Sequence, residues 1–185
     1  RLVNGRGGRL RRPDPIATEP FLVIADLDGG GQWADINLAT PITCEAIESL
    51  YQEQVIEEEL VVWDERIGAV RASCRRSLGS VILSEVALSK PDEQSLVHAL
   101  LQGIGKVGIH ILNIPLELQQ WRSRVMWVHR IEAPHSDWPD LADKALLTTL
   151  DQWLGPYLAG ITTLDRVKRL DVTVPLHALL TREQQ

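Results

Sequence analysis

The sequence predicts an α+β protein, in which an OB-like antiparallel β-barrel is followed by a helical C-terminal extension. From residue 1 to 88, short apolar runs alternate with a period of about 2 and are separated by turn residues. From Ser89 onward the period changes to about 3.6, the period of helices. One short helix after the third strand gives the element order of an OB-type barrel, although a generic antiparallel sheet with one helix fits almost as well. We therefore expect two domains, residues 1–88 and 89–185.

About five or six strands are expected in the first domain. Asn4-Gly5 predicts a type I′ hairpin turn, because both central positions of that turn need a positive φ. Gly29-Gly30-Gly31 joins the second strand to the third, and Thr43 can cap a short helix within residues 40–51. The expected strands are the short runs on either side of Asn4-Gly5 and residues 21–28, 32–39, 54–64, 67–76 and 80–88.

The second domain is expected to begin with a helix, because Ser89, Pro91, Asp92 and Glu93 form a favourable helix start. A third helix is expected from an Asp140 cap to Gly155-Pro156. Shorter helices are expected at residues 164–170 and after Thr173. The expected core positions are Leu96, Leu100 and Ile104 in the first helix, Leu118, Trp121, Val125 and Val128 in a second at residues 116–131, and Leu147, Leu150 and Leu154 in the third.

Composition excludes several classes of protein. The chain has 185 residues, 44% hydrophobic and 24% charged, which is close to the globular average and argues against disorder. No apolar run is long enough for a membrane span, and the basic first residues lack a signal-peptide core, so we expect a cytoplasmic protein. Two cysteines, Cys44 and Cys74, provide neither a disulfide framework nor a zinc-binding spacing. Because the chain begins at Arg1, within the predicted hairpin, we expect a piece of a longer protein.

The charge is distributed in blocks. The net charge is −6, but residues 1–12 carry five Arg and no acid, and residues 66–76 carry four Arg and no acid. Residues 45–65 carry eight acids and no base. Any electrostatic function must therefore be local.

Enzyme signatures are absent from the sequence. The glycine cluster lacks the following Lys-Ser/Thr of a phosphate-binding loop, and there is no G-x-S-x-G motif. Asp26 and Asp28 lie on one strand face, as a catalytic carboxylate pair would, but they also fit solvated residues before a turn. A metal site at His129, His135 and Asp137 is disfavoured, because their spacing fits no helical face and Pro134 interrupts the segment.

A basic strand ridge is the first candidate for nucleic-acid binding. Arg71 and Arg75 share a strand face with Ser73 between them, and guanidinium groups bind phosphate through two hydrogen bonds. The opposite face, Val70, Ala72 and Cys74, is expected to be core-facing. An alternative stays open: in a hairpin centred on Glu65, Glu59 falls opposite Arg71 and neutralises it.

Trp33 and a basic helix are the other candidates. Trp33 alternates with Asp35 and Asn37, away from the side of Ala34, Ile36 and Leu38, so its ring can lie on a polar face and stack on unpaired bases. A tryptophan at the start of a strand more often covers one end of the barrel. Arg122, Arg124 and Arg130 lie in a helical segment with no acid between Leu118 and Ile131, which makes that helix electropositive or simply solvated.

Eight segments together resemble one region of a known family. They are RLVNGRGGRL, FLVIADLDG, VVWDERIGAVRA, LGSVILSEVAL, LQQWRSRVMWVHR, WPDLADKALL, WLGPYLAGI and LDVTVPLHALL. In order and spacing they are similar to the C-terminal region of the HrpB-type ATP-dependent RNA helicases of the DEAH/DExH-box class. The resemblance implies an OB-like domain at residues 1–88 and a family-specific extension at 89–185. It also implies that ATP and Mg²⁺ are bound by helicase domains outside this sequence, and that this region holds no cofactor.

Taken with the resemblance, the residues predict an accessory nucleic-acid-binding region that guides single-stranded RNA or DNA, inactive as an ATPase on its own. The candidate contacts are Trp33, Arg71, Arg75, Arg122 and Arg124. Partners would be the single strand and the helicase core of the same protein. The rival prediction is a docking module that acts on the helicase core without touching RNA, and the net charge of −6 favours it. A free-standing hydrolase using Asp26 and Asp28 is the third and least favoured hypothesis.

Overall fold

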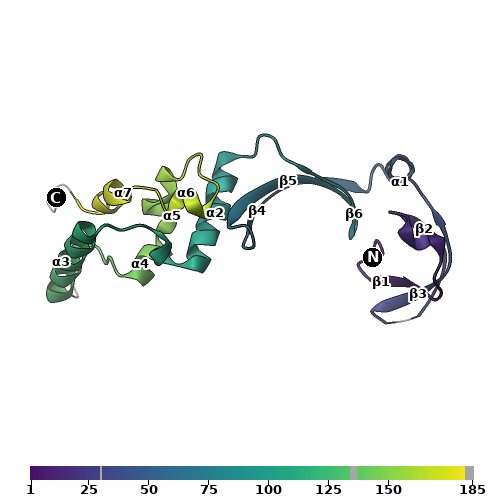
Figure 1. Cartoon of the computed structure of the whole chain (residues 1–185), viewed down its shortest axis with the longest axis horizontal. Coiled ribbons are helices and arrows are strands. Elements are labelled where there is room, and N and C mark those ends of the chain that lie inside the picture. The colour runs from purple at the N-terminus through teal and green to yellow at the C-terminus, as the bar shows by residue number, and fades with distance from the viewer. Residues whose placement is uncertain (30, 134–136, 182–185) are drawn as a thin grey trace. The chain divides into compact units, whose positions relative to one another are not determined.

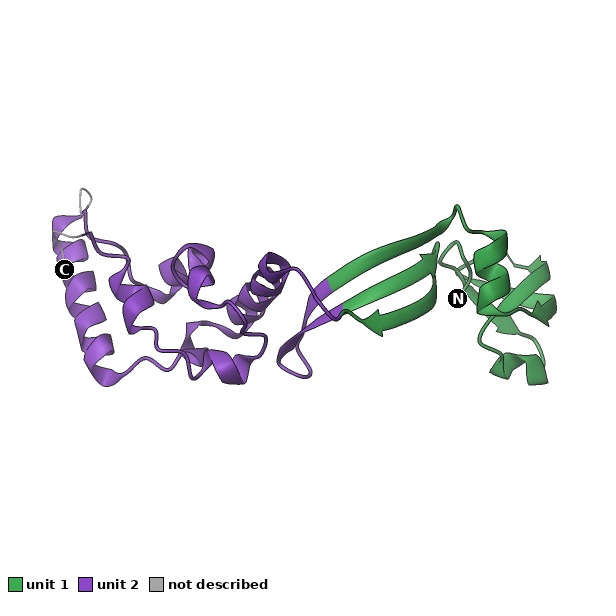
Figure 2. Ribbon diagram, turned by 90° about the horizontal axis from the view of Figure 1, so that it is seen from above, with its two compact units in different colours: residues 1–60, 73–88 green, residues 61–72, 89–185 purple. Residues whose placement is uncertain are grey.

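The computed structural model describes residues 1–29, 31–133 and 137–181 (Figure 1). The chain divides into two compact units (Figure 2). Unit 1 comprises residues 1–60 and 73–88, and unit 2 comprises residues 61–72 and 89–185. The α+β class predicted from the sequence is confirmed. The predicted domain boundary at residue 88 stays a prediction, and residues 61–72 pack with the helices.

The first sheet belongs to unit 1. It consists of β1 (Gly7–Leu10), β2 (Leu22–Asp28) and β3 (Trp33–Pro41), in the order β1-β3-β2. β1 runs parallel to β3 with Gly7 beside Trp33, and β2 runs antiparallel to β3. The register of β2 shifts between Ile24 and Leu27. Leu38 is consequently 61% exposed, although the alternation predicted that it faces the core with Ala34 and Ile36, which are both buried.

The turn at Asn4-Gly5 differs from the predicted type I′ turn. Of the two residues, only Gly5 has a positive φ, of 87°, and no described non-glycine residue has one. The Gly5 N–H donates to the Leu2 carbonyl at 2.9 Å, and the Leu2 N–H donates to the Arg6 carbonyl at 2.8 Å. One extra residue therefore enters the loop, as in hairpins that close with a glycine bulge, and Asn4 needs no left-handed conformation.

A short helix and a second sheet follow. In α1 (Cys44–Leu50), the Thr43 hydroxyl accepts a hydrogen bond from the Ala46 N–H at 3.2 Å, which confirms the predicted cap. The second sheet has the order β4-β5-β6. Its strands are β4 (Val55–Asp64), β5 (Ala69–Leu78) and β6 (Val81–Ala87). Ile47 of α1 packs with Leu78 and Leu83 of this sheet in the small core of unit 1.

The single OB-like barrel expected from the element order is not present among the described residues. A barrel requires each edge strand to bond to another strand until the sheet closes. Here the strands form two three-stranded sheets, with β1 and β2 at the edges of one and β4 and β6 at the edges of the other. The tight turn at Gly79, whose φ is 53°, pairs β6 back onto β5 and leaves β6 at an edge.

Unit 2 is mainly helical. Its helices are α2 (Glu93–Val107), α3 (Leu116–Glu132), α4 (Asp143–Thr148), α5 (Leu150–Trp153), α6 (Leu164–Val167) and α7 (Thr173–His177), with 3-10 turns at Ile109–Ile111 and Gly155–Tyr157. Leu100, Ile104, Leu118 and Val125 are buried in one core, as predicted. Asp92 caps α2, because its carboxylate accepts from the Ser95 N–H at 2.8 Å. In the described part of the chain, none of these helices combines the length and the apolar composition needed to cross a membrane.

The predicted third helix is wrong in its details. Asp140 does not cap a helix but accepts from the Ala142 N–H at 2.9 Å, in a turn before α4. The helix is interrupted after Thr148, and α5 starts at Leu150. The hydroxyls of Thr148 and Thr149 donate to the carbonyls of Lys144 and Ala145, and such back-bonding competes with a regular helix.

The tip of the β4–β5 hairpin packs against the helices of unit 2. The indole ring of Trp63 lies against Gly103 of α2, where an added Cβ would overlap the ring. The Val70 N–H donates to the Thr162 carbonyl at 2.8 Å, and the Leu164 N–H donates to the Gly68 carbonyl at 3.0 Å. These bonds make a short antiparallel bridge beside α6, so the hairpin tip belongs physically to the helical core.

Two glycines of α2 test this packing. Gly103→Ala should lower the free energy of unfolding by about 1–3 kcal/mol, because the new methyl group displaces the indole of Trp63. Gly105→Ala is the matched control, since no heavy atom lies within 4 Å of its added Cβ, and it should stabilise by about 0.5–1 kcal/mol through helix propensity. Chemical denaturation of both variants measures the difference. Equal stabilisation by the two substitutions would show that Trp63 does not press on α2.

Candidate nucleic-acid interface

Arg71 of β5 is neutralised by Asp64 at the end of β4. The Arg71 guanidinium lies 3.5 Å from the Asp64 carboxylate, which is largely buried. Burial raises the pKa of Asp64, but hydrogen bonds from the Arg66 and Ile67 N–H groups, the Arg66 charge and a hydrogen bond from Arg71 together hold that pKa below its usual range. The sequence placed Glu59 opposite Arg71. In the structure the guanidinium instead contacts Asp64. The hairpin loop closes at Asp64, where the Gly68 N–H donates a hydrogen bond to the Asp64 carbonyl, and this register determines which acid lies beside Arg71.

Arg75 is engaged by Glu85 on the neighbouring strand. Arg75 pairs with Glu85 in the β5–β6 register, and its Nε and Nη2 lie 3.2 and 3.1 Å from one carboxylate oxygen. The other oxygen accepts from the Ser73 hydroxyl at 2.9 Å. Ser73 is only 8% exposed, so the exposed ridge expected at Arg71, Ser73 and Arg75 is wrong at its centre.

A third strand arginine was not among the predicted contacts. Arg76 lies 2.7 Å from Glu48 of α1 and 3.5 Å from Glu57 of β4. These ion pairs could have been predicted from the sequence, because the acidic block at residues 45–65 is followed directly by the arginine block at residues 66–76. Consecutive antiparallel strands bring such blocks side by side, where opposite charges attract.

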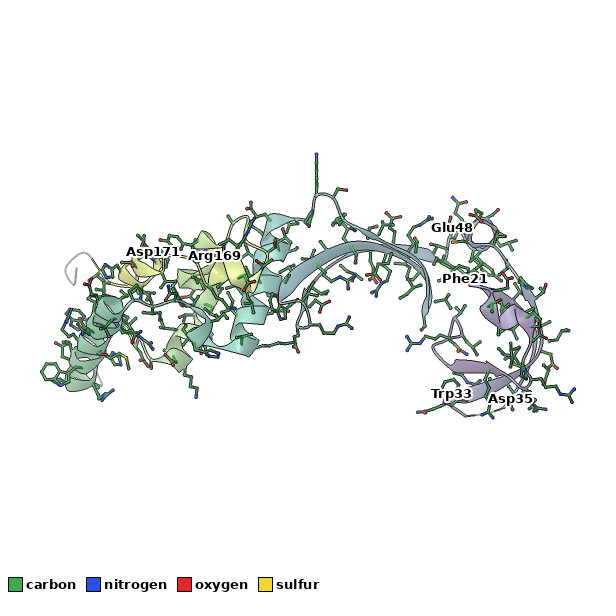
Figure 3. All side chains as sticks on the ribbon, viewed as in Figure 1. Phe21, Trp33, Asp35, Glu48, Arg169 and Asp171 are labelled. Atoms are coloured by element: carbon green, nitrogen blue, oxygen red, sulfur yellow. The ribbon has the colours of Figure 1, made fainter. Side chains whose placement is uncertain are left out.

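Trp33 is a predicted contact that stays accessible. Its side chain on β3 is 63% exposed, and it lies over Gly7 of β1, where a methyl group would overlap the ring (Figure 3). Arg6, next to Gly7 in the sequence, donates to the carbonyls of Gly31 and Gly29 at 3.0 and 2.7 Å. The indole thus lies accessible on the sheet formed by β1 and β3.

An arginine–aspartate cluster covers the same sheet face as Trp33. Arg9 lies 2.6 Å from Asp35, and Arg11 bridges Asp35 and Asp28 at 3.3 and 2.9 Å. The hydrogen bond from Arg9 holds the pKa of Asp35 below its usual range, against the effect of desolvation. Asp28 is therefore an ion-pair partner, and Asp26 and Asp28 have the surroundings of solvated and paired residues rather than of a catalytic dyad.

No metal site forms in the described residues. No group of three His, Cys, Asp or Glu side chains there could hold an ion. His129, one of the three candidate ligands, is hydrogen-bonded through Nδ1 to the Trp138 carbonyl at 2.7 Å. His135 lies outside the described residues.

The two predicted arginines of α3 have different surroundings. Arg122 is 16% exposed, donates to the Leu141 carbonyl at 2.6 Å and lies 2.5 Å from Asp143, so it ties α3 to the segment before α4. Arg124 is exposed and forms no ion pair with any residue that the structure describes. Of the predicted contacts, Trp33 and Arg75 belong to unit 1, and Arg71, Arg122 and Arg124 belong to unit 2.

The arginine–aspartate cluster predicts a pH dependence. Because the pKa of Asp35 is lowered in the folded state, its charge stabilises the fold at neutral pH, and this contribution disappears as the pH falls below about 4. Asp35→Asn should lower the free energy of unfolding at pH 7, with a smaller loss at pH 3. Asp26→Asn is the control, since Asp26 forms no ion pair with the described residues. An equal loss at both pH values for Asp35→Asn would contradict this assignment.

Comparison with known proteins agrees with the resemblance seen in the sequence. Residues 54–88 match the family model described as "ATP-dependent RNA helicase HrpB, connector region". The chain is 31% identical over 181 residues to the ATP-dependent RNA helicase HrpB of Escherichia coli K12, which covers 97% of this chain and 22% of that protein.

Solved structures give the same relationship. The crystal structure of the E. coli DExH-box NTPase HrpB matches with a TM-score of 0.50 and 31% identity, over 100% of this chain and 23% of that one. A second crystal structure, of the E. coli DEAH/RHA helicase HrpB, matches at 29% identity with a TM-score of 0.49, over 98% of this chain and 23% of that one. The chain thus spans about a fifth of the length of these relatives. It is homologous, over nearly its whole length, to one part of the HrpB-type ATP-dependent RNA helicases.

Proposed function

We propose that this chain is an accessory region of an ATP-dependent RNA helicase of HrpB type, and that it acts chiefly by docking on the rest of the helicase. The support is its homology to about a fifth of such a protein. ATP and Mg²⁺ would be bound by the domains that the relatives have beyond this part, in a cytoplasmic protein.

The observation that carries the docking role is that three of the four arginines predicted to bind nucleic acid are already paired with carboxylates of the chain. Arg71, Arg75 and Arg122 were expected to hold phosphates, yet each has a carboxylate of the same chain within 3.5 Å. A phosphate would have to displace that carboxylate. Such competition removes most of the electrostatic gain on which binding to the nucleic-acid backbone depends.

The connector match supports the same role. Residues 54–88 form β4, β5 and β6, and the tip of the β4–β5 hairpin packs on the helices of unit 2 through Trp63. The carboxylates of Glu45, Glu53 and Glu58 are exposed and have no ion-pair partner among the described residues. These three acids lie in and just before the matched segment, and such an acidic exterior repels RNA and suits contact with a basic protein surface.

A second candidate function rests on Trp33. Its exposed indole, supported by Gly7, could stack on a base of single-stranded RNA, with the sheet of β1, β2 and β3 as the binding surface. In this alternative the region guides the strand while ATP is hydrolysed elsewhere in the helicase.

A double variant tests whether the strand arginines Arg71 and Arg75 hold phosphates. With Arg71→Ala and Arg75→Ala combined, docking predicts a less than about twofold change in affinity for single-stranded RNA and an unchanged salt slope. If both guanidinium groups hold phosphates, the slope of log affinity against log salt should flatten by about 0.7 for each phosphate that is no longer neutralised. Fluorescence anisotropy with a labelled single-stranded RNA at several salt concentrations measures the affinity and its salt slope. A flattened slope would overturn the docking proposal in favour of the guide.

The docking role has its own positive test. Adding the chain to a HrpB-type helicase from which the homologous region has been removed should change its RNA-stimulated ATPase rate. Neutralising Glu45, Glu53 and Glu58 to Gln should weaken that effect, and Asp26→Asn serves as the control for removal of charge elsewhere. No effect of the chain on the shortened helicase would contradict docking.

A further inference from the structure

The outward face of α3 carries an aromatic side chain between two cationic ones. Trp127 is 65% exposed, and Arg124 and Arg130 precede and follow it by three residues. At about 100° per residue, the two arginines project about 60° to either side of the indole along the same helix face. The inward face of α3 holds Leu118 and Val125 in the core.

The two guanidinium groups on this face are available, unlike those of the strands. Neither Arg124 nor Arg130 forms an ion pair with any residue that the structure describes, whereas Arg122, on the side of α4, is bound to Asp143. No acid lies between Leu118 and Ile131, and Glu117 and Glu132 stand at the two ends of the helix. The centre of the face therefore combines an exposed ring with uncompensated positive charge.

This arrangement fits a polyanion that also offers flat rings. Single-stranded nucleic acids are held by stacking of bases on aromatic side chains and by cations along the backbone. A stacked base on Trp127 would place the phosphates before and after it toward Arg124 and Arg130. Because the indole is exposed, none of the described side chains has to move before a base can stack on it.

We infer that the outward face of α3, with Trp127 flanked by Arg124 and Arg130, is a binding site for single-stranded nucleic acid. This inference goes beyond docking, because it assigns a polynucleotide contact to a helix of unit 2 instead of to the strands. Exposed Leu116 and Ile131 at the ends of the face would also suit an acidic protein surface. Charge complementarity with phosphate on both sides of one ring favours the nucleic acid.

The test uses the whole chain and a fluorescein-labelled single-stranded 12-nucleotide RNA, with binding followed by anisotropy at low and moderate salt. Trp127→Ala should weaken binding about 5- to 100-fold, and Trp127→Phe should retain most of the affinity because a ring remains. Arg124→Ala combined with Arg130→Ala should weaken binding and flatten the salt slope by about 0.7 for each phosphate that loses its cation. Circular dichroism should show unchanged helix content, since all three side chains are exposed.

Matched controls separate this face from other exposed groups. Trp33→Ala removes the indole on which the alternative function of unit 1 rests. As controls, Tyr51→Ala removes an exposed aromatic ring of unit 1 that has no assigned role, and Arg169→Ala removes an exposed arginine of unit 2 that has no ion pair among the described residues. Both controls should change the affinity less than twofold. A weakening at Trp33 with none at Trp127 would assign RNA to unit 1 and overturn the inference, as would the absence of RNA binding at low salt.

A polyglutamate peptide distinguishes a nucleic acid from an acidic protein surface. It should bind much more weakly than the RNA and should be insensitive to Trp127→Ala, because it offers no base to stack. If it binds as tightly as the RNA, and if Trp127→Ala weakens both equally, the face is an acidic-protein docking site and the inference fails. The docking proposal, tested by the ATPase rate of the shortened helicase, would survive that result.

Discussion

The packing of the β4–β5 hairpin tip on the helices is the contact on which the rest of unit 2 depends. The Trp63 ring lies where only a glycine at position 103 leaves room, and the backbone bridge at Ala69 and Thr163 fixes the strand beside α6. The buried Trp63 Nε1–H finds no acceptor among the described residues, so apolar contact holds the ring in place. A strand pair that would otherwise end in solvent thereby becomes part of a helical core.

Charge pairing determines what the strands present to a partner. The acids of residues 45–65 meet cations of neighbouring elements at Arg76, Arg71 and Lys106. Each exposed pair contributes about 0–1 kcal/mol, so the main consequence is a reduced capacity to bind anions rather than a gain in stability. The arginine block at residues 66–76 is consequently not a basic surface. Positive charge remains uncompensated on α3, where the sequence has no acid for thirteen residues after Leu118.

Much of the local structure could be predicted from the sequence. The strands from Leu22 onward, the Thr43 cap and the inward face of α3 follow from periodicity and capping chemistry, which depend on neighbours in sequence. The parallel pairing of β1 with β3, the two separate sheets and the docking of Trp63 on Gly103 depend on contacts between distant segments. Local patterns do not determine those contacts, and the homology to HrpB-type helicases was accessible only because eight segments occur in a familiar order.

The candidate site shows the same division. Exposure of Trp33 and Arg124 could be predicted from alternation and helical spacing, but the partners of Arg71 and Arg75 could not. A small difference in where the hairpin loop closes places Asp64, instead of Glu59, beside Arg71. The partner of Arg75 lies on β6, outside the acidic block at residues 45–65, so the distribution of charge along the sequence does not indicate it. Trp127 was missed because a tryptophan in an amphipathic segment suggests a core position, although its place opposite Leu118 and Val125 was available in the spacing.

Hydrogen exchange of the backbone amides of Val70 and Leu164 shows whether the hairpin tip and the helices form one cooperative body. These two N–H groups make the bridge between β5 and the segment at α6. If they do, the amides of Val70 and Leu164 should be protected from exchange to the same degree as those of Leu100 and Ile104 in the core of α2. All four amides should then lose their protection together under mild denaturant. Exchange of Val70 and Leu164 as fast as that of the exposed loop residues Arg66 and Ile67, with α2 still protected, would contradict this cooperativity.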